Sequence, residues 1–194
     1  GIRIVDTNND GSLTPEDRVA LGTPYPDFTW GITNTFQIKD FDISFLIQGV
    51  QGITVLNGDV YYNETKKWNK KYTKNRWVSA EHPGDGKTPY QNVKTGHDLM
   101  LTDYPLQNAS YACLRNFTVG YTLPATAARK IKLSGVRFYV SGSNLLYIWG
   151  SGYKGINPES RMTSGNYSSA MISGYQRGGF PLTSTISAGF DINF

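Results

Sequence analysis

The chain has 194 residues, of which 39% are hydrophobic and 18% are charged, and its formal net charge is +4. This composition excludes a disordered chain. Because no apolar run approaches the roughly 20 residues that a membrane-spanning helix needs, it also excludes a helical membrane protein. The many Gly, Tyr and Phe residues favour β-structure. The chain begins at Gly1 without a signal peptide, so we expect it to be processed, truncated or part of something longer.

Near the start, the segment D-T-N-N-D-G-S-L-T-P-E-D has the spacing of a calcium-binding loop of the EF-hand and dockerin type. Gly11 occupies the sixth position, where such a loop turns sharply. The five expected Ca²⁺ ligands are Asp6, Asn8, Asp10, Ser12 and Asp17. No apolar helix follows, which favours a structural clip over a calcium sensor. An Asp- and Asn-rich turn that binds no ion is the alternative.

The next segment predicts a β-hairpin. Apolar and polar residues alternate from Phe28 to Phe36 and again from Phe41 to Ile47, and Q-I-K-D between them is a short turn. Each strand has one apolar and one polar face. Each is also about long enough to cross an outer membrane when tilted.

The stretch 49–110 is too long for an ordinary connection. We consider a short helix around Tyr61 to Trp77. The basic run 66–76 interleaves lysines with aromatic residues, but no nucleic-acid-binding motif accompanies it. We therefore expect a solvated or lipopolysaccharide-facing loop and no nucleic acid partner.

Two further strands follow, joined by another short segment. The first covers 111–123, where Arg115 interrupts an expected apolar face and would be a defect if that face met lipid. That face comprises Tyr111, Cys113, Phe117, Val119, Tyr121 and Leu123. Cys113 is the single cysteine, so it cannot form an internal disulfide. The second strand alternates from Val136 to Ser141 and continues into Asn144.

A second long polar stretch, 147–182, precedes a final alternating segment, T-S-T-I-S-A-G-F-D-I-N-F. Its apolar residues fall on one face: Ile186, Ala188, Phe190, Ile192 and Phe194. A lipid-facing barrel strand and the last strand of an antiparallel sandwich both fit this segment.

Aromatic residues of the two long stretches are candidates for contacts with a substrate or a partner, because such side chains stack on sugar rings and anchor interfaces. They are Tyr61, Tyr62, Trp68, Trp77, Trp149 and Tyr153. Packing of the loops against each other is the alternative.

Short connections at one end of the strands and long ones at the other are typical of outer-membrane barrels. Several stretches, in order and over nearly the whole chain, then resemble the C-terminal part of SusC/RagA-type TonB-linked outer-membrane transporters. These are D-T-N-N-D-G-S-L-T-P-E-D-R, L-G-T-P-Y-P-D-F-T-W-G-I, K-D-F-D-I-S-F-L-I-Q-G-V-Q-G, N-R-W, S-Y-A-C-L-R-N-F-T-V-G-Y-T-L-P, V-R-F-Y-V-S-G-S-N-L-L, Y-K-G-I-N-P-E and G-F-D-I-N-F.

The resemblance implies an all-β fold, in which antiparallel strands form the C-terminal part of a large transmembrane β-barrel of about 22 strands with long extracellular loops. Residues 1–27 would be an extracellular loop with the calcium-binding-like turn. Residues 28–194 would supply about five strands, with outer loops at 49–110 and 147–182.

The resemblance further implies a part of a TonB-dependent importer of oligosaccharides or peptides, with no enzyme activity, in the cell outer membrane of a Gram-negative bacterium. A SusD-like surface lipoprotein, the TonB complex (through an N-terminal part) and outer-membrane lipid would be its partners. Phe190, Ile192 and Phe194 would signal barrel assembly. The alternative is a soluble, calcium-stabilised β-sandwich that binds carbohydrate.

Overall fold

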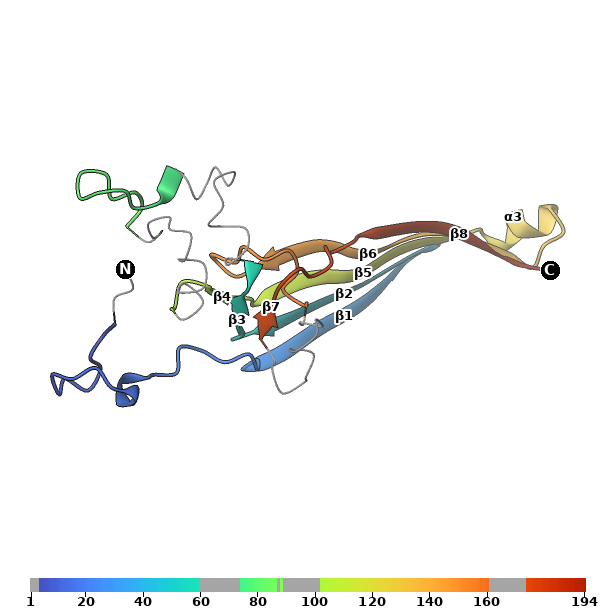
Figure 1. Ribbon diagram of the computed structural model, residues 1–194. Helices are drawn as coiled ribbons and strands as arrows, with labels where there is room; N and C mark the ends of the chain where they lie inside the picture. The colour runs from blue at the N-terminus through green and yellow to red at the C-terminus, as the bar shows by residue number, and fades with distance from the viewer. Residues whose placement is uncertain (1–3, 60–73, 87, 89–101, 161–173) are drawn as a thin grey trace.

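A computed structural model describes residues 4–59, 74–86, 88, 102–160 and 174–194 (Figure 1). Most of the segment considered for a short helix, with Tyr61, Tyr62 and Trp68, lies outside these residues, and so does most of the basic run 66–76. None of the helices in the described part is long and apolar enough to span a membrane.

Five long strands form one antiparallel sheet in the order β1-β2-β5-β6-β8. Their bounds are β1 Phe28–Ile38, β2 Phe41–Gln51, β5 Tyr111–Thr122, β6 Gly135–Trp149 and β8 Thr185–Asn193. The alternation in the sequence predicts these strands because a sheet with one apolar face needs apolar side chains at every second position. The expected all-β, antiparallel class is confirmed.

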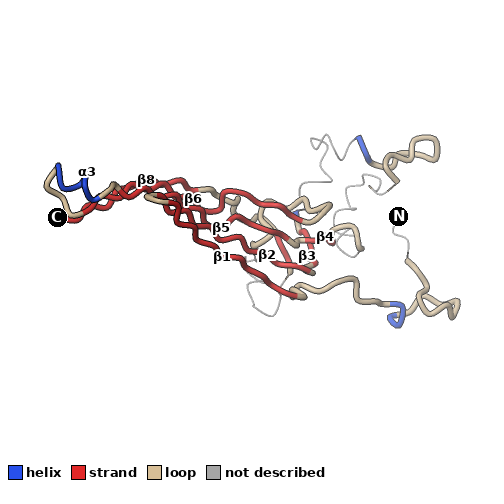
Figure 2. The backbone as a smooth tube through the Cα atoms, turned by 180° about the vertical axis from the view of Figure 1, so that it is seen from behind, coloured by secondary structure: helices blue, strands red, loops and turns tan. Residues whose placement is uncertain are grey.

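The connections differ between the two ends of this sheet (Figure 1, and Figure 2 from behind). At one end, Lys39 and Asp40 join β1 to β2, and Lys39 has the left-handed φ of 54° that a tight hairpin turn requires. The short helix α3, Ala125–Lys130, joins β5 to β6 at the same end. The described parts of the segments that connect β2 to β5 and β6 to β8 lie at the opposite end.

Residues paired between neighbouring strands share a face of the sheet, so the register defines the two faces. One row across all five strands is apolar: Phe36, Ile43, Val119, Val140 and Ala188. The next row across all five strands is hydroxylic: Thr35, Ser44, Thr118, Ser141 and Ser187. The long sheet therefore has an apolar face and a polar face.

The apolar face is exposed over much of its length. Val140 is 53% exposed and Phe190 is 64% exposed. Other large apolar side chains on this face are also exposed: Ile32, Phe36, Phe41, Phe138 and Ile186. Within the described residues no second sheet packs on this face, which does not favour the β-sandwich alternative.

The face expected for 111–123 is wrong in its first part. The register shifts at Arg115, between Leu114 and Asn116, and this β-bulge reverses the alternation. Cys113 pairs with Gln48 on the polar face, whereas Phe117, Val119 and Tyr121 stay on the apolar face. Leu123 lies just beyond the end of β5. The bulge also turns Arg115 away from the apolar face, so the arginine is no defect there.

The described parts of the long connections pack against one another at their end of the sheet. A second, three-stranded sheet has the order β4-β3-β7, with β3 Thr54–Asn57, β4 Leu106–Asn108 and β7 Tyr175–Gln176. A small buried core holds these segments together, and partly buried Val50 of β2 packs against it. Its members are Ile53, Val55, Ala109 and Tyr153.

Candidate functional site

The N-terminal loop adopts the turn that its motif predicts. Asn9 and Gly11 have left-handed φ angles of 60° and 81°. The Asp6 carboxylate accepts hydrogen bonds from the backbone N–H groups of Asp10 (3.3 Å) and Gly11 (2.8 Å), and Asp10 Oδ1 accepts one from Ser12 N–H (2.7 Å). The Asp6 and Asp10 carboxylates therefore hydrogen-bond to the backbone of the turn while remaining accessible to solvent.

Asp17 closes this loop. Its Oδ1 accepts from the backbone N–H of Thr7 and its Oδ2 from that of Thr14, both at 2.8 Å. The second bond belongs to a capping box at the start of η1, Pro15–Asp17. The backbone N–H donors of Thr14 and then Thr7 hold the pKa of Asp17 below its usual value, because they stabilise the ionised carboxylate.

The donor set of the loop fits calcium in its chemistry, since carboxylate, amide and carbonyl oxygens are the ligands that calcium takes. Asn8 is the expected uncharged side-chain ligand, and its Oδ1 accepts from Asp10 N–H at 3.0 Å. In the part of the chain that the structure describes, no three or more His, Cys, Asp or Glu side chains gather closely enough to hold a metal ion. Calcium ligation by this loop stays a prediction.

A polar network on the polar face of the sheet is centred on Arg115. Its Nη1 donates to Asn144 Oδ1 (2.7 Å) and to the hydroxyl of Tyr147 (2.9 Å), and its Nη2 forms a salt bridge with Glu159. With its amide oxygen turned toward the guanidinium, Gln48 also accepts from Arg115, at 2.6 and 2.9 Å.

This network joins three strands to the loop that follows β6. Gln48 lies on β2, Arg115 on β5, and Asn144 and Tyr147 on β6, whereas Glu159 belongs to the loop. Asn144 has a left-handed φ of 55°, and its side chain reaches Arg115 beside the bulge. The arginine therefore fixes the loop above the polar face of the sheet.

A second charged cluster lies on the polar face toward the other end of the sheet. Arg137 on β6 donates to both oxygens of Asp42 on β2, from Nε at 3.0 Å and Nη2 at 2.6 Å, although β5 lies between these strands. A longer contact of 3.4 Å joins Arg137 to Asp191 on β8. Gly120 on β5 makes room for this bridge, because a Cβ atom there would collide with both Arg137 and Asp42.

The candidate aromatic residues divide into exposed and buried ones. Trp77 and Trp149 are 43% and 44% exposed. Tyr153 is buried in the core of the loop region, where its hydroxyl donates to Gln176 Oε1 at 2.9 Å and its ring lies 6.1 Å from that of Trp149. Tyr153 thus packs the loops together.

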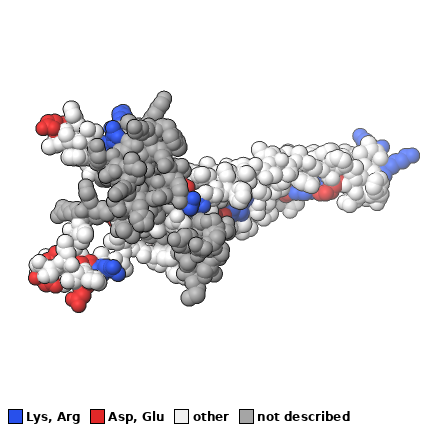
Figure 3. Space-filling view, in the orientation of Figure 1, with Lys and Arg blue, Asp and Glu red and all other residues white. Residues whose placement is uncertain are grey.

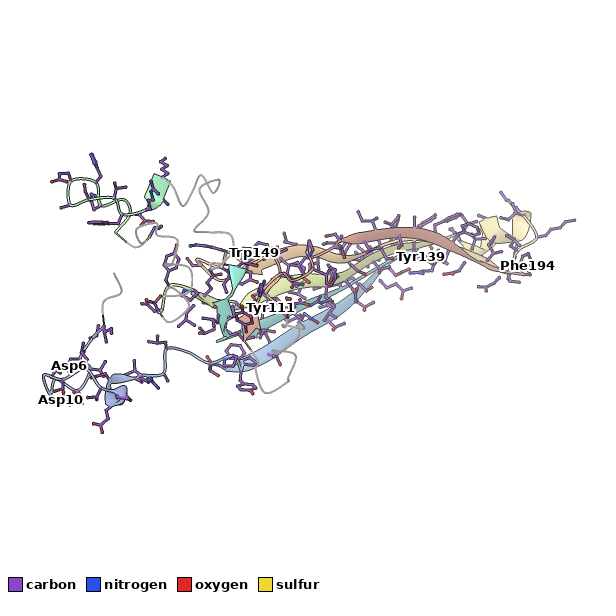
Figure 4. The ribbon with its side chains drawn as sticks, in the orientation of Figure 1. Asp6, Asp10, Tyr111, Tyr139, Trp149 and Phe194 are labelled. Carbon is purple, nitrogen blue, oxygen red and sulfur yellow. The ribbon has the colours of Figure 1, made fainter. Side chains whose placement is uncertain are left out.

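Figure 4 shows how far apart the candidate residues lie. Asp6 and Asp10 lie in the N-terminal loop, away from the sheet. Tyr111 and Trp149, paired in register on β5 and β6, lie where the sheet meets the connecting loops. Phe194 lies at the opposite end and is 94% exposed. The structure brings the loop residues 6–17 together, but it does not bring them to the aromatic candidates.

Sequence comparison identifies relatives that match the whole chain. The chain is 29% identical to TonB-dependent receptor P26 of Formosa agariphila over 204 residues, which cover 100% of the chain and 20% of the receptor. It is 28% identical to TonB-dependent receptor SusC of Bacteroides thetaiotaomicron over 156 residues, covering 80% of the chain and 15% of SusC. No protein-family model matches the chain.

Structural comparison agrees on the fold. The chain superposes on the RagAB peptide importer in its closed-closed state with a TM-score of 0.65 and 19% identity, covering 95% of the chain and 20% of that chain. The open-open state gives a TM-score of 0.62 and 22% identity, covering 87% and 17%. At these identities the likeness shows the fold alone.

A two-faced antiparallel sheet with long connections at one end is the kind of structure that lines an outer-membrane barrel. The similarity to the C-terminal part of SusC/RagA-type TonB-linked outer-membrane transporters, predicted from the ordered motifs, is confirmed. The chain spans about a fifth of the length of the curated relatives that match it from end to end.

Proposed function

We propose that the chain forms part of the wall of a TonB-dependent importer in the cell outer membrane of a Gram-negative bacterium. The long sheet would belong to a transmembrane barrel of about 22 strands, with its apolar face toward lipid and its polar face toward the lumen. The role is transport and not catalysis, in line with relatives named as receptors and importers.

The observation that carries this proposal is the exposed apolar face. On β6 this face extends from Val136 to Ile148. At about 3.3 Å per residue and a tilt of 35–45°, that distance corresponds to a height of roughly 30 Å. An outer-membrane barrel presents an apolar band of about 25 Å to lipid, so the strand is long enough to cross it.

The folded loop region would then face the outside. This end of the sheet carries the buried core around Ile53 and Tyr153 and the Arg115 network. In a TonB-linked importer of this kind, a SusD-like lipoprotein would seat on this outward-facing region. Of the candidate aromatic residues in the described part, Trp77 and Trp149 are the partly exposed ones, and they would contact a partner or an oligosaccharide or peptide substrate.

Two smaller assignments belong to the same proposal. The loop 6–17 would bind a structural Ca²⁺ through Asp6, Asn8, Asp10, Ser12 and Asp17. The apolar side chains of β8 and the residue after it would serve barrel assembly, since Phe190 and Phe194 are both largely exposed. Replacing Phe194 by Ala in the full-length protein should lower the amount of assembled transporter, and normal amounts would contradict this assignment.

Two adjacent residues of β6 test the orientation of the sheet. Val140 lies on the apolar face and Ser141 on the polar face. In the full-length protein, Val140→Lys should sharply reduce the folded, membrane-inserted fraction, because a lysine facing the middle of the bilayer costs about 2–4 kcal/mol. Ser141→Lys is the matched control and should insert normally. Equal insertion of both variants, or equal loss, would contradict the proposed membrane-facing surface.

A further inference from the structure

Three cationic residues lie together at the end of the long sheet that carries the short connections. Arg129 and Lys130 form the last turn of α3, and Lys132 follows two residues later. In Figure 3 basic side chains project from this tip, whereas the loops at the opposite end carry both acidic and basic side chains. The described part of the molecule therefore has a basic end beyond its short connections.

The segment that carries these cations is held firmly against the sheet. The N–H of Leu123 donates to the carbonyl of Val136 (2.8 Å), and the N–H of Ser134 donates to the carbonyl of Asn193 (2.8 Å). Ala128, in the middle of α3, is fully buried. The positions of the cations are thus set by the fold.

The side chains of these cations are exposed, and in the described part of the chain none has an ion pair. Arg137, by contrast, is occupied by Asp42 and Asp191 on the polar face. The neighbouring hairpin turn contributes one cation, Lys39, and one anion, Asp40, so it does not neutralise the group. The three charges are therefore available to an external anion.

The position of the three cations relative to the apolar face indicates which kind of anion they would bind. Tyr121, near the end of that face, precedes α3 by only four residues, so α3 starts within about 10–15 Å of the apolar surface. Ile131, between the cations, is 57% exposed. Basic side chains beside an exposed apolar residue at the edge of an apolar band are typical of a surface that contacts lipid headgroups.

We propose that Arg129, Lys130 and Lys132 bind the phosphate groups of anionic phospholipids at the short-connection end of the sheet. This inference rests on the proposed function, in which the apolar face meets lipid and the long loops face outward. The surface would then lie at the inner leaflet. It would hold the tip of the sheet at the headgroup level and so fix the depth of the strands in the bilayer.

The test uses the full-length protein reconstituted into vesicles of phosphatidylcholine and phosphatidylglycerol in equal amounts. After extraction in mild detergent, mass spectrometry measures the ratio of the two lipids that remain bound. We expect phosphatidylglycerol to be enriched on the wild-type protein. Arg129→Gln with Lys130→Gln should reduce this enrichment at least fivefold, because each cation near an anionic surface contributes about a fivefold effect.

A matched control variant removes two positive charges at the opposite end of the sheet, where the loops lie. Arg18→Gln with Lys74→Gln also replaces one exposed arginine and one exposed lysine, and it should leave the enrichment unchanged. The exchange Arg129→Lys with Lys130→Arg keeps both charges and should preserve the enrichment. Loss of enrichment in either of these variants would contradict the proposal, as would wild-type protein that retains both lipids equally.

The two proposals fail in different ways. If the wild-type protein inserts into vesicles but shows no preference for phosphatidylglycerol, the lipid-binding surface is wrong and the membrane-spanning sheet stands. If the folded protein does not insert at all, the proposed function itself is wrong. Release of the bound lipid by inorganic phosphate at millimolar concentration would indicate a general anion site and would also overturn the lipid assignment.

Discussion

Arg115 on β5 and Glu159 in the loop after β6 form a salt bridge between residues 44 positions apart in the sequence. Both side chains are about three-quarters buried, and the same glutamate oxygen accepts from the Tyr147 hydroxyl at 3.0 Å. Because the bulge at Arg115 turns its side chain to the polar face, a residue that would be costly against lipid instead holds a loop to the sheet.

Replacing Arg115 by Gln should therefore loosen that loop while leaving the strands paired. Losing one partner of a partly buried charged network costs about 1–3 kcal/mol, which should raise hydrogen exchange of residues 150–160 by roughly tenfold or more. Arg115→Lys keeps the charge but not the forked donors, and it should give an intermediate effect. Exchange that is unchanged in both variants would show that the network does not hold the loop.

The two acidic neighbours of Arg137 should differ in importance. Asp42 receives two short hydrogen bonds from the guanidinium, whereas Asp191 is 58% exposed and makes one contact of 3.4 Å. Asp42→Asn should cost about 1–3 kcal/mol and Asp191→Asn less than about 0.5 kcal/mol. Both losses of stability can be measured on gel electrophoresis, as the temperature at which the band of the folded protein disappears for each variant. Equal shifts would contradict the geometry.

Gly120 should be irreplaceable at the point where Arg137 crosses β5 to reach Asp42. A side chain there would displace the ion pair, so Gly120→Val should destabilise the protein at least as much as Asp42→Asn. Because both changes break the same bridge, combining them should cost less than the sum of the two. Gly135→Ala is the control, since a Cβ atom there would come no closer than 3.4 Å to any neighbour. Additive effects of Gly120→Val and Asp42→Asn would show that the glycine acts by another route.

Calcium should protect the N-terminal loop from protease. If Asp6 and Asp10 are ligands, Asp6→Ala with Asp10→Ala should abolish the difference in cleavage of residues 4–22 between calcium and chelator. Asp40→Ala with Asp103→Ala removes the same charge elsewhere and should leave that difference intact. Identical cleavage of the wild-type protein with calcium and with chelator would contradict a calcium site.

The same loop should loosen in acid. The pKa of Asp17 is lowered in the folded loop, so its stabilising effect is fully present above the ordinary aspartate value near 3.8. That effect is lost as the pH falls through the lower, folded pKa. Hydrogen exchange at Thr7 and Thr14, corrected for the intrinsic pH dependence, should rise below about pH 4 in the wild-type protein. Asp17→Asn should show fast exchange at every pH, and a pH-independent wild type would contradict the role of this carboxylate.

Much of the long sheet can be predicted from the sequence, because alternation with a period of two is a local signal. The apolar positions of β1, β2 and β8 follow directly from it. The bulge at Arg115 is different, since one extra residue reverses the alternation, and the charged residue that interrupts the expected apolar face does not by itself show whether it is a bulge or a defect of that face. For the same reason Tyr111 and Cys113 are predicted on the wrong face. In addition, β6 extends to Trp149, beyond the predicted alternation that ends at Asn144.

The site is less predictable because its contacts join distant residues. The turn over residues 6–17 is local, and its spacing predicts its shape. By contrast, Arg137 meets Asp42 across 95 residues, and β3 pairs with both β4 and β7 through segments of only two to four residues. Such short strands carry too few residues to show a pattern, and their pairing depends on how the long loops fold.

The most direct test of the central claim is an immunoblot of outer-membrane fractions with an antibody raised against this chain, run with and without boiling. We predict a band of about 100 kDa whose mobility changes on heating. The size follows because the chain of 21.6 kDa matches 20% of a receptor's length. The change in mobility follows because a folded barrel, closed by hydrogen bonds between its strands, would resist detergent until it is heated. A soluble band near 21.6 kDa, unchanged by heating, would contradict the account.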